Sequence, residues 1–231
     1  MPSVLIVGAS GGIGRATVAR LKQEGYKVIA SDRERLSVPP LVDDFITADL
    51  TIDAELDGLC NPLIAAQNEL WGIVFCSGLY PIKPFPEYSI ELWDEVNQVN
   101  LRSIFSISQK LVCLIPEGGR IVIVASGASH AGSRDIAYSS SKAGAIGLVR
   151  SLCKVLAPDG ILVNAVAPGV IKTPMSKQMD STHQQEYLDA IPLGRFGSPD
   201  EIAVCISFLL REENSYMTGA TLDVNGGLYA R

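Results

Sequence analysis

The sequence predicts an α/β protein built on a doubly wound parallel sheet with helices on both faces. Short apolar runs such as Val4–Val7 and Arg120–Ala125 alternate along the chain with longer amphipathic stretches. Apolar strands of this kind are typical of a sheet covered on both faces, and their alternation with helices favours parallel pairing. The chain has 231 residues, of which 47% are hydrophobic and 19% charged. We therefore expect residues 1–231 to form a single domain.

The expected elements follow one another without repeats or linkers. Strands are expected at residues 4–7, 27–31, 45–47, 72–75, 120–125, 161–166 and 221–224. Helices are expected from a glycine-rich turn to about residue 24, and over residues 89–100, 101–115, 138–156 and 199–210. The last of these is expected to begin with Ser198 as N-cap and Pro199 at N1. Residues 52–68 are weakly helical and interrupted by Pro62, while Pro39–Pro40 exclude a full helix before the third strand. The polar stretch 176–187 has little core pattern and indicates a mobile substrate lid around residues 174–195.

Composition excludes several classes of protein. A formal net charge of −6, with the basic residues scattered, argues against a nucleic-acid partner. Five widely spaced cysteines without a Cys-x-x-Cys pair indicate reduced thiols, and His130 and His183 lack ligand-like neighbours, so no metal is expected. The chain begins directly with a strand pattern and contains no apolar run near 18 residues. We expect a protein without a membrane partner, located in the cytoplasm.

The turn after the first strand has the composition of a phosphate cradle. It runs Gly8-Ala9-Ser10-Gly11-Gly12-Ile13-Gly14 and leads into a helix. At a helix start, unpaired backbone N–H groups and the helix dipole favour an anion, and glycines let it approach closely. The spacing Gly-x-x-x-Gly-x-Gly differs from the Gly-x-Gly-x-x-Gly of the Rossmann fingerprint. A flexible glycine turn without a ligand is the alternative interpretation.

Asp32, at the end of the second strand, lies 18 residues after Gly14. This is close to the spacing of about 20 residues at which a carboxylate meets the adenosine ribose of a dinucleotide. An ordinary aspartate at a strand end is the alternative. The other strand ends, at Cys76–Gly78, Ser126 and Pro168–Thr173, fall at the same edge of a parallel sheet, where such folds bind ligands.

Tyr138 and Lys142 lie four residues apart and share one helix face, about 5–6 Å apart at Cβ. An ammonium at that distance favours the phenolate, so we expect Lys142 to lower the pKa of Tyr138 below its usual value of about 10. A tyrosine tuned in this way can exchange a proton near neutral pH. The pair alone is weak evidence, because Tyr-x-x-x-Lys occurs on many exposed helix faces by chance.

Together these motifs resemble the short-chain dehydrogenase/reductase family over almost the full length of the chain. Gly8–Gly14 resembles the glycine loop of the family, with Val7 in its threonine position, and Asp49-Leu50 resembles its adenine-contacting pair. Two departures stand out. In the first, Phe75-Cys76-Ser77-Gly78 stands where family members usually have Asn-Asn-Ala-Gly. In the second, Ser126 precedes Tyr138 by 12 residues, whereas 13 is commoner in the family, so Ser129 is kept as an alternative for the catalytic serine.

The resemblance implies roles for individual residues. The implied catalytic group is Asn100, Ser126, Tyr138 and Lys142. The implied cofactor-binding residues are Gly8, Ser10, Gly11, Gly12, Ile13, Gly14, Asp32, Arg33, Asp49, Leu50, Cys76, Ser77, Gly78, Tyr138, Lys142, Pro168, Gly169, Val170, Ile171 and Thr173. Asn100 is expected to position a water that links Lys142 to solvent. Ser126 is expected to orient the oxygen of the substrate.

The implied activity is that of an NAD-dependent oxidoreductase, an alcohol dehydrogenase or carbonyl reductase. It would interconvert a secondary alcohol or diol and the ketone, with Tyr138 as general acid and base. The expected cofactor is NAD, because Asp32 repels a 2′-phosphate and because Gly11 stands where NADP-preferring members often carry a basic residue; Arg33 complicates this choice.

Two other classes remain open. One is a non-catalytic, dinucleotide-binding regulatory protein on the same fold. The other is a nucleotide-sugar epimerase or dehydratase, although only about 40 residues follow the expected lid. We also expect a homo-oligomer, by family resemblance a tetramer, because the helix 101–115 is apolar over more of its surface than one core-facing stripe requires.

Overall fold

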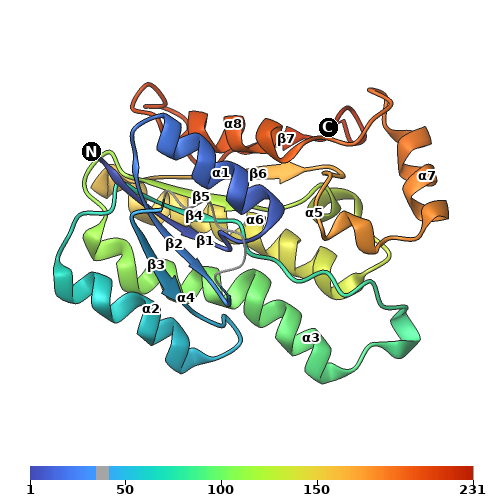
Figure 1. Ribbon diagram of the computed structural model, residues 1–231, viewed down its shortest axis with the longest axis horizontal. Coiled ribbons are helices and arrows are strands. Elements are labelled where there is room, and N and C mark those ends of the chain that lie inside the picture. Colours follow the sequence, from blue (N-terminus) through green and yellow to red (C-terminus); the bar gives the residue numbers. More distant parts are fainter. Residues whose placement is uncertain (35–41, 231) are drawn as a thin grey trace.

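The computed structural model describes residues 1–34 and 42–230, so the expectation for Pro39–Pro40 lies outside the described residues. Seven parallel strands form one sheet in the order β3-β2-β1-β4-β5-β6-β7 (Figure 1). The strands are β1 Ser3–Val7, β2 Lys27–Asp32, β3 Asp44–Thr47, β4 Gly72–Phe75, β5 Arg120–Val124, β6 Leu162–Pro168 and β7 Thr221–Val224. The predicted doubly wound parallel sheet is therefore confirmed.

The strand order reverses between β1 and β4. After β1 the chain adds β2 and β3 on one side, and it then returns to place β4 and the later strands on the other side. At such a switch point the loops leave neighbouring strands in opposite directions and open a crevice at their carboxyl ends. The crevice lies next to the glycine turn 8–14, as expected from the sequence.

Two helical layers cover the sheet (Figure 1). Helices α1 and α8 pack on one face, where Val18 and Leu21 meet Ile202 and Ile206 over Val4 and Ile6. On the other face α2, α4 and α6 bury their apolar sides over the alternate residues of the same strands. The helices are α1 Gly12–Gln23, α2 Asp53–Ala66, α3 Ile90–Asn97, α4 Ser103–Leu111, α5 Ala128–Ala131, α6 Ile136–Leu156, α7 Ser181–Ala190 and α8 Pro199–Leu210.

One local expectation was wrong. Pro62 does not interrupt α2, which continues to Ala66. Leu59, Cys60 and Leu63 are buried on both sides of the proline, and this packing offsets the backbone hydrogen bond that proline cannot donate. The polar stretch 176–187, for which no helix was named, contains the first part of α7, in which His183 is the buried residue. This helix begins at an Asp180 N-cap that accepts from the backbone N–H of His183.

The helical region expected as 89–100 and 101–115 contains a π-turn at its junction. Gln98–Arg102 forms the π-turn between α3 and α4, and Asn100 lies within it, fully buried. Single π-turns inside helices are frequently found at functional sites, because they displace one side chain from the helical register. The predicted start of α8 is confirmed as a capping box, in which Ser198 and Glu201 each accept from the backbone of the other.

Within the residues that the structure describes, no helix is both long enough and apolar enough to cross a bilayer.

Candidate active site

Two adjoining pockets occupy the carboxyl edge of the sheet. One extends from the glycine turn to the ends of β2 and β3. The other lies between the ends of β4 and β5, helix α6 and the loop after β6. Both are lined by Ile13, Cys76, Ser77, Gly78, Thr173 and Met175, so they form one continuous cleft. Its length along the sheet edge suits an elongated ligand.

The glycine turn fits a phosphate group. A Cβ on Gly12 would lie 2.6 Å from Cγ2 of Thr173, so the loop after β6 packs closely against the glycine turn. The first turn of α1, residues 12–15, carries no acidic side chain, and its N-cap Gly11 makes no side-chain capping bond. The backbone N–H groups at this helix start are therefore available to an anion.

Gly14 has a different role from the one implied by the resemblance. It lines neither pocket, and a Cβ there would lie 2.1 Å from the carbonyl oxygen of Gly8. The absence of a side chain at Gly14 lets α1 pack against the end of β1. Every other predicted cofactor-binding residue lines one or both pockets.

Asp32 closes the far end of the cleft. Its carboxylate accepts from the backbone N–H of Ser10 at 2.8 Å and from that of Arg33 at 2.8 Å. Both partners fix the carboxylate at the end of β2. Burial acts to raise the pKa of the nearby Asp49 carboxyl, but hydrogen bonds from the backbone N–H and the hydroxyl of Thr51 lower it. The positive charge of Arg33 lowers the pKa of Asp49 further.

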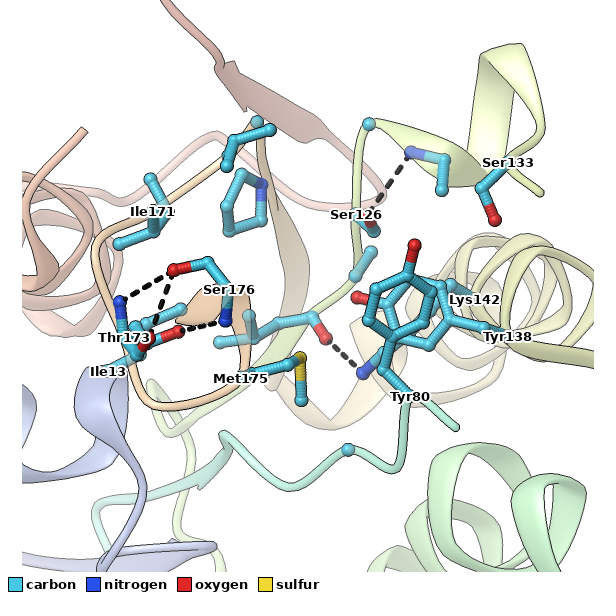
Figure 2. A pocket seen from close by; sticks show the side chains of 18 of the residues that line it. Ile13, Tyr80, Ser126, Ser133, Tyr138, Lys142, Ile171, Thr173, Met175 and Ser176 are labelled. Atoms are coloured by element: carbon cyan, nitrogen blue, oxygen red, sulfur yellow. Dashed lines mark hydrogen bonds between the residues drawn. The ribbon is translucent and has the colours of Figure 1, made fainter. Parts of the chain in front are cut away.

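Three of the four catalytic candidates, Ser126, Tyr138 and Lys142, gather in the other pocket (Figure 2), whereas Asn100 lines neither pocket. Asp135 caps α6 by accepting from the backbone N–H of Tyr138 at 2.9 Å. The first turn of the helix directs Tyr138 into the pocket, and Lys142 follows one turn later. Ser126 reaches the same pocket from the end of β5. The ring of Tyr80 lies 4.6 Å from that of Tyr138, centroid to centroid.

Lys142 is buried, with 3% of its surface exposed. Its ammonium donates to the carbonyl of Val124 at 2.8 Å and to that of Ser77 at 3.2 Å. Burial lowers the pKa of Lys142 to about 8, because the charged form loses its hydration. Lys142 therefore joins α6 to the ends of both β4 and β5.

The expectation that Lys142 lowers the pKa of Tyr138 was wrong for this structure. Burial raises the pKa of Tyr138, and the charge of Asp135 and the phenol of Tyr187 raise it further. A hydrogen bond with Ser126 acts in the opposite direction. The ammonium of Lys142 is directed to backbone carbonyls and lies 6.0 Å from the centroid of the Tyr138 ring. Tyr138 is consequently a neutral phenol at neutral pH here.

The structure distinguishes between the two candidate serines. Ser126 lines the pocket and acts to lower the pKa of Tyr138, and its hydroxyl accepts from the backbone N–H of Ala128 at 3.1 Å. Ser129 lies in α5, is not among the residues that line this pocket, and has a buried hydroxyl. The short helix α5 occupies the loop that is one residue shorter than usual.

Asn100 contacts the backbone of the cleft wall. Its amide nitrogen donates to the carbonyl of Leu79 and to the hydroxyl of Ser141, both at 3.0 Å. Its amide oxygen accepts from the N–H of Leu79 at 2.7 Å. The π-turn directs this side chain inward and ties the segment after β4 to α6. The water relay expected for Asn100 stays a prediction.

Several residues of the site carried no sequence signal strong enough to name them. Tyr187 from α7 and Tyr229 near the C-terminus both line the catalytic pocket. Tyr187 lies in the stretch expected as a lid, but nothing in the sequence singles out either tyrosine, and only the tertiary structure brings them together. Asp135, by contrast, has the signature of an N-cap before an apolar helical run and could have been found from that pattern.

Comparisons with known proteins agree with this geometry. A family model described as enoyl-(acyl carrier protein) reductase matches residues 8–229. The chain is 35% identical to 3-oxoacyl-(acyl-carrier-protein) reductase FabG of Thermotoga maritima, covering 97% of this chain and 96% of that protein. It is 35% identical to the acetoacetyl-CoA reductase of an Acinetobacter species over the same shares. A short chain dehydrogenase family protein of Francisella tularensis has a similar structure, with a TM-score of 0.91, 27% identity and 100% coverage of both chains.

Gly14→Ala should destabilise the fold, because its methyl group would meet the backbone of Gly8 and force α1 away from β1. We expect a loss of about 1–3 kcal/mol in the free energy of unfolding, measured by urea titration. Gly58→Ala is the matched control: its Cβ would meet nothing within 4 Å on helix α2, so about 0.5–1 kcal/mol should be gained. A Gly14→Ala protein as stable as wild type would contradict the packing role.

Proposed function

Because this chain belongs to the short-chain dehydrogenase/reductase family, we propose that it is an NAD-dependent oxidoreductase that interconverts a ketone and a secondary alcohol. The observation that carries the proposal is the meeting of Tyr138, Ser126 and Lys142 in one pocket that is continuous with the phosphate cradle. A proton carrier, an oxyanion partner and a dinucleotide cleft are the parts that hydride transfer to a carbonyl requires.

We propose 3-oxoacyl thioesters as the first substrates to test. The two curated relatives are named for 3-oxoacyl and acetoacetyl groups, which share a ketone two carbons from a thioester. The catalytic pocket supports a neutral substrate. Apart from Lys142, the described residues that line it carry no positive charge, and Ile171, Met175, Met179 and Tyr187 give it an apolar wall. A carboxylate or phosphate beside the ketone would lack a free cation there.

Bound NAD supplies the hydride chemistry, and the cleft residues supply its position. The N–H groups at the start of α1 would hold the pyrophosphate and Asp32 the adenosine ribose, while Pro168–Thr173 would line the nicotinamide side. Lys142, which joins α6 to the strand ends, lies beside Gly78 on the wall of the same cleft. The glycine cradle and the open helix start fit this group.

Tyr138 exchanges the proton. In reduction its phenol, which is protonated at neutral pH, donates to the ketone oxygen. In oxidation it takes the hydroxyl proton of the alcohol as the hydride leaves the carbinol carbon. Ser126 donates a hydrogen bond to the same oxygen and stabilises its developing charge. Lys142 holds α6, and with it Tyr138, at the ends of β4 and β5 through the carbonyls of Ser77 and Val124.

The preference for NAD follows from the charges around the adenosine end. Asp32 is fixed by two backbone N–H groups and can accept from ribose hydroxyls. A 2′-phosphate about 4 Å away would be repelled by about 4 kcal/mol at an effective dielectric constant near 20. Arg33, the next residue in the chain and also on the wall of this pocket, offsets part of this repulsion.

Three further expectations stay predictions. They are a substrate lid around residues 174–195, a cytoplasmic location and a homotetramer. For the lid, Met175, Ser176, Met179 and Tyr187 border the catalytic pocket, so movement of this segment would open it. For assembly, Phe105 on α4 and Val155 on α6 are large apolar side chains with 47% and 68% of their surface exposed.

Tyr138→Phe should lower kcat by about 10²–10⁴-fold, because it removes the proton carrier and little else. The dissociation constant of NADH, measured by fluorescence titration, should change less than threefold. Tyr216→Phe, at a fully exposed tyrosine, is the control and should keep wild-type activity. A Tyr138→Phe protein that retains more than about a tenth of wild-type kcat would refute the assigned role.

Asp32→Ala should move the ratio of kcat/KM for NAD over NADP toward NADP by at least about tenfold. The change removes the repulsion of a 2′-phosphate and leaves Arg33 free to attract it. Asp44→Ala removes the same charge from an exposed position on the neighbouring strand β3 and should leave the ratio unchanged. The account fails if wild type prefers NADP, or if the ratio of Asp32→Ala equals that of wild type.

A further inference from the structure

A single carboxylate connects the cleft wall to the helix that carries Tyr138. Asp135 is 1% exposed and has two acceptor oxygens in use. Its Oδ1 accepts from the hydroxyl of Tyr88 at 2.8 Å as well as from the backbone N–H of Tyr138. Its Oδ2 accepts from the backbone N–H of Lys83 at 3.4 Å. A buried carboxylate with these three donors holds two parts of the chain, the segment with Lys83 and Tyr88 and the start of α6, in one arrangement.

The segment from Leu79 to Tyr88, here called the wall segment, is fixed at both ends. Asn100 binds the backbone of Leu79 at the first end, and Asp135 binds Lys83 and Tyr88 at the second. Both anchors also contact α6, Asn100 through Ser141 and Asp135 through its cap. Tyr80 lies between the anchors, with its ring against that of Tyr138.

The backbone of the wall segment is strained. Ile82 has a φ of +56°, in the left-handed region that a β-branched residue rarely adopts. Such a conformation costs free energy and persists only where the surroundings hold it. Ile82 stands between the two anchors and one residue before Lys83. Strain at this position indicates that the anchors impose the shape of the segment.

We propose that Asp135 is a positioning residue for Tyr138: with Tyr88 it holds the strained wall segment against the tyrosine, and its negative charge opposes formation of the phenolate. It needs no contact with the substrate. The kinetic part of this inference rests on the proposed function, whereas the structural part does not.

The charges that face Tyr138 give Asp135 a distinct electrostatic role. Four other titratable side chains share the pocket of Tyr138: Tyr80 from the wall segment, Lys142 from α6, Tyr187 from α7 and Tyr229 from the C-terminal segment. Burial raises the pKa of Tyr80, of Tyr187 and of Tyr229, so these phenols stay neutral. Burial is the largest cause that raises the pKa of Tyr138, and the charge of the Asp135 carboxylate raises it further. The carboxylate therefore favours the protonated tyrosine that reduction uses.

Hydrogen exchange tests the positioning role without any turnover. In Tyr88→Phe the carboxylate and the helix cap remain, but the hydroxyl that ties the wall segment is lost. We expect amides in residues 79–88 to exchange about tenfold faster than in wild type or more. Tyr216→Phe removes a hydroxyl from a fully exposed tyrosine and should leave this exchange unchanged. Unchanged exchange of 79–88 in Tyr88→Phe would overturn the inference.

The pH profile of alcohol oxidation tests the role of the charge. Oxidation needs Tyr138 as a base, so kcat/KM rises with pH through its pKa. Asp135→Asn retains the shape of the cap and removes the negative charge, which lowers that pKa and should move the rise to lower pH by about one unit. Asp159→Asn makes the same change beyond the other end of α6 and should not move it. A rise at the wild-type pH in Asp135→Asn would show that the carboxylate is a structural cap alone and would overturn the inference.

The two measurements separate failure of this inference from failure of the proposed function. Absence of turnover in wild type with ketones and both cofactors would refute the proposed function, while the exchange result would still decide the positioning role. If Asp135→Asn does not fold, Tyr88→Phe and its exchange measurement remain decisive.

Discussion

The buried ammonium of Lys142 is the interaction on which the site depends. A lysine with 3% exposure must replace its lost hydration with protein dipoles, and here the carbonyls of Val124 and Ser77 provide them. These carbonyls stand at the ends of β5 and β4, so the requirement fixes α6 against the part of the sheet where the cleft opens. Tyr138, one turn earlier on the same helix, is placed at the pocket as a result. The parallel sheet makes this possible because all its strands end at one edge.

Much of the fold and of the site could be predicted from the sequence, because both rest on local patterns. Apolar runs indicated the strands, and the capping signals at Ser198 indicated the start of α8. The glycine turn, Asp32, Tyr138 and Lys142 were found by spacing, and the sheet then brings them to one edge. Pro62 marks the limit of this reasoning, since tertiary packing continues a helix that the local rule would end.

What could not be predicted depends on contacts between distant parts of the chain. Helix spacing suggested that Lys142 would act directly on Tyr138, yet the ammonium is directed to two carbonyls and burial raises the pKa of the phenol. The tie between Asp135 and Tyr88 joins residues 47 positions apart. Ile82 takes its strained conformation because Asn100 and Asp135 hold both sides of its segment, and the identity of the residue gives no sign of it.

The central claim is that this cleft transfers a hydride between a nicotinamide and a ketone carbon. The most direct measurement uses NADH carrying deuterium at the transferred position of C4, with acetoacetyl-CoA as the ketone, and analyses the product by mass spectrometry. The account predicts one deuterium on the carbinol carbon, with the hydroxyl proton drawn from solvent through Tyr138. A reduced product without deuterium on that carbon, although labelled NADH is consumed, would contradict it.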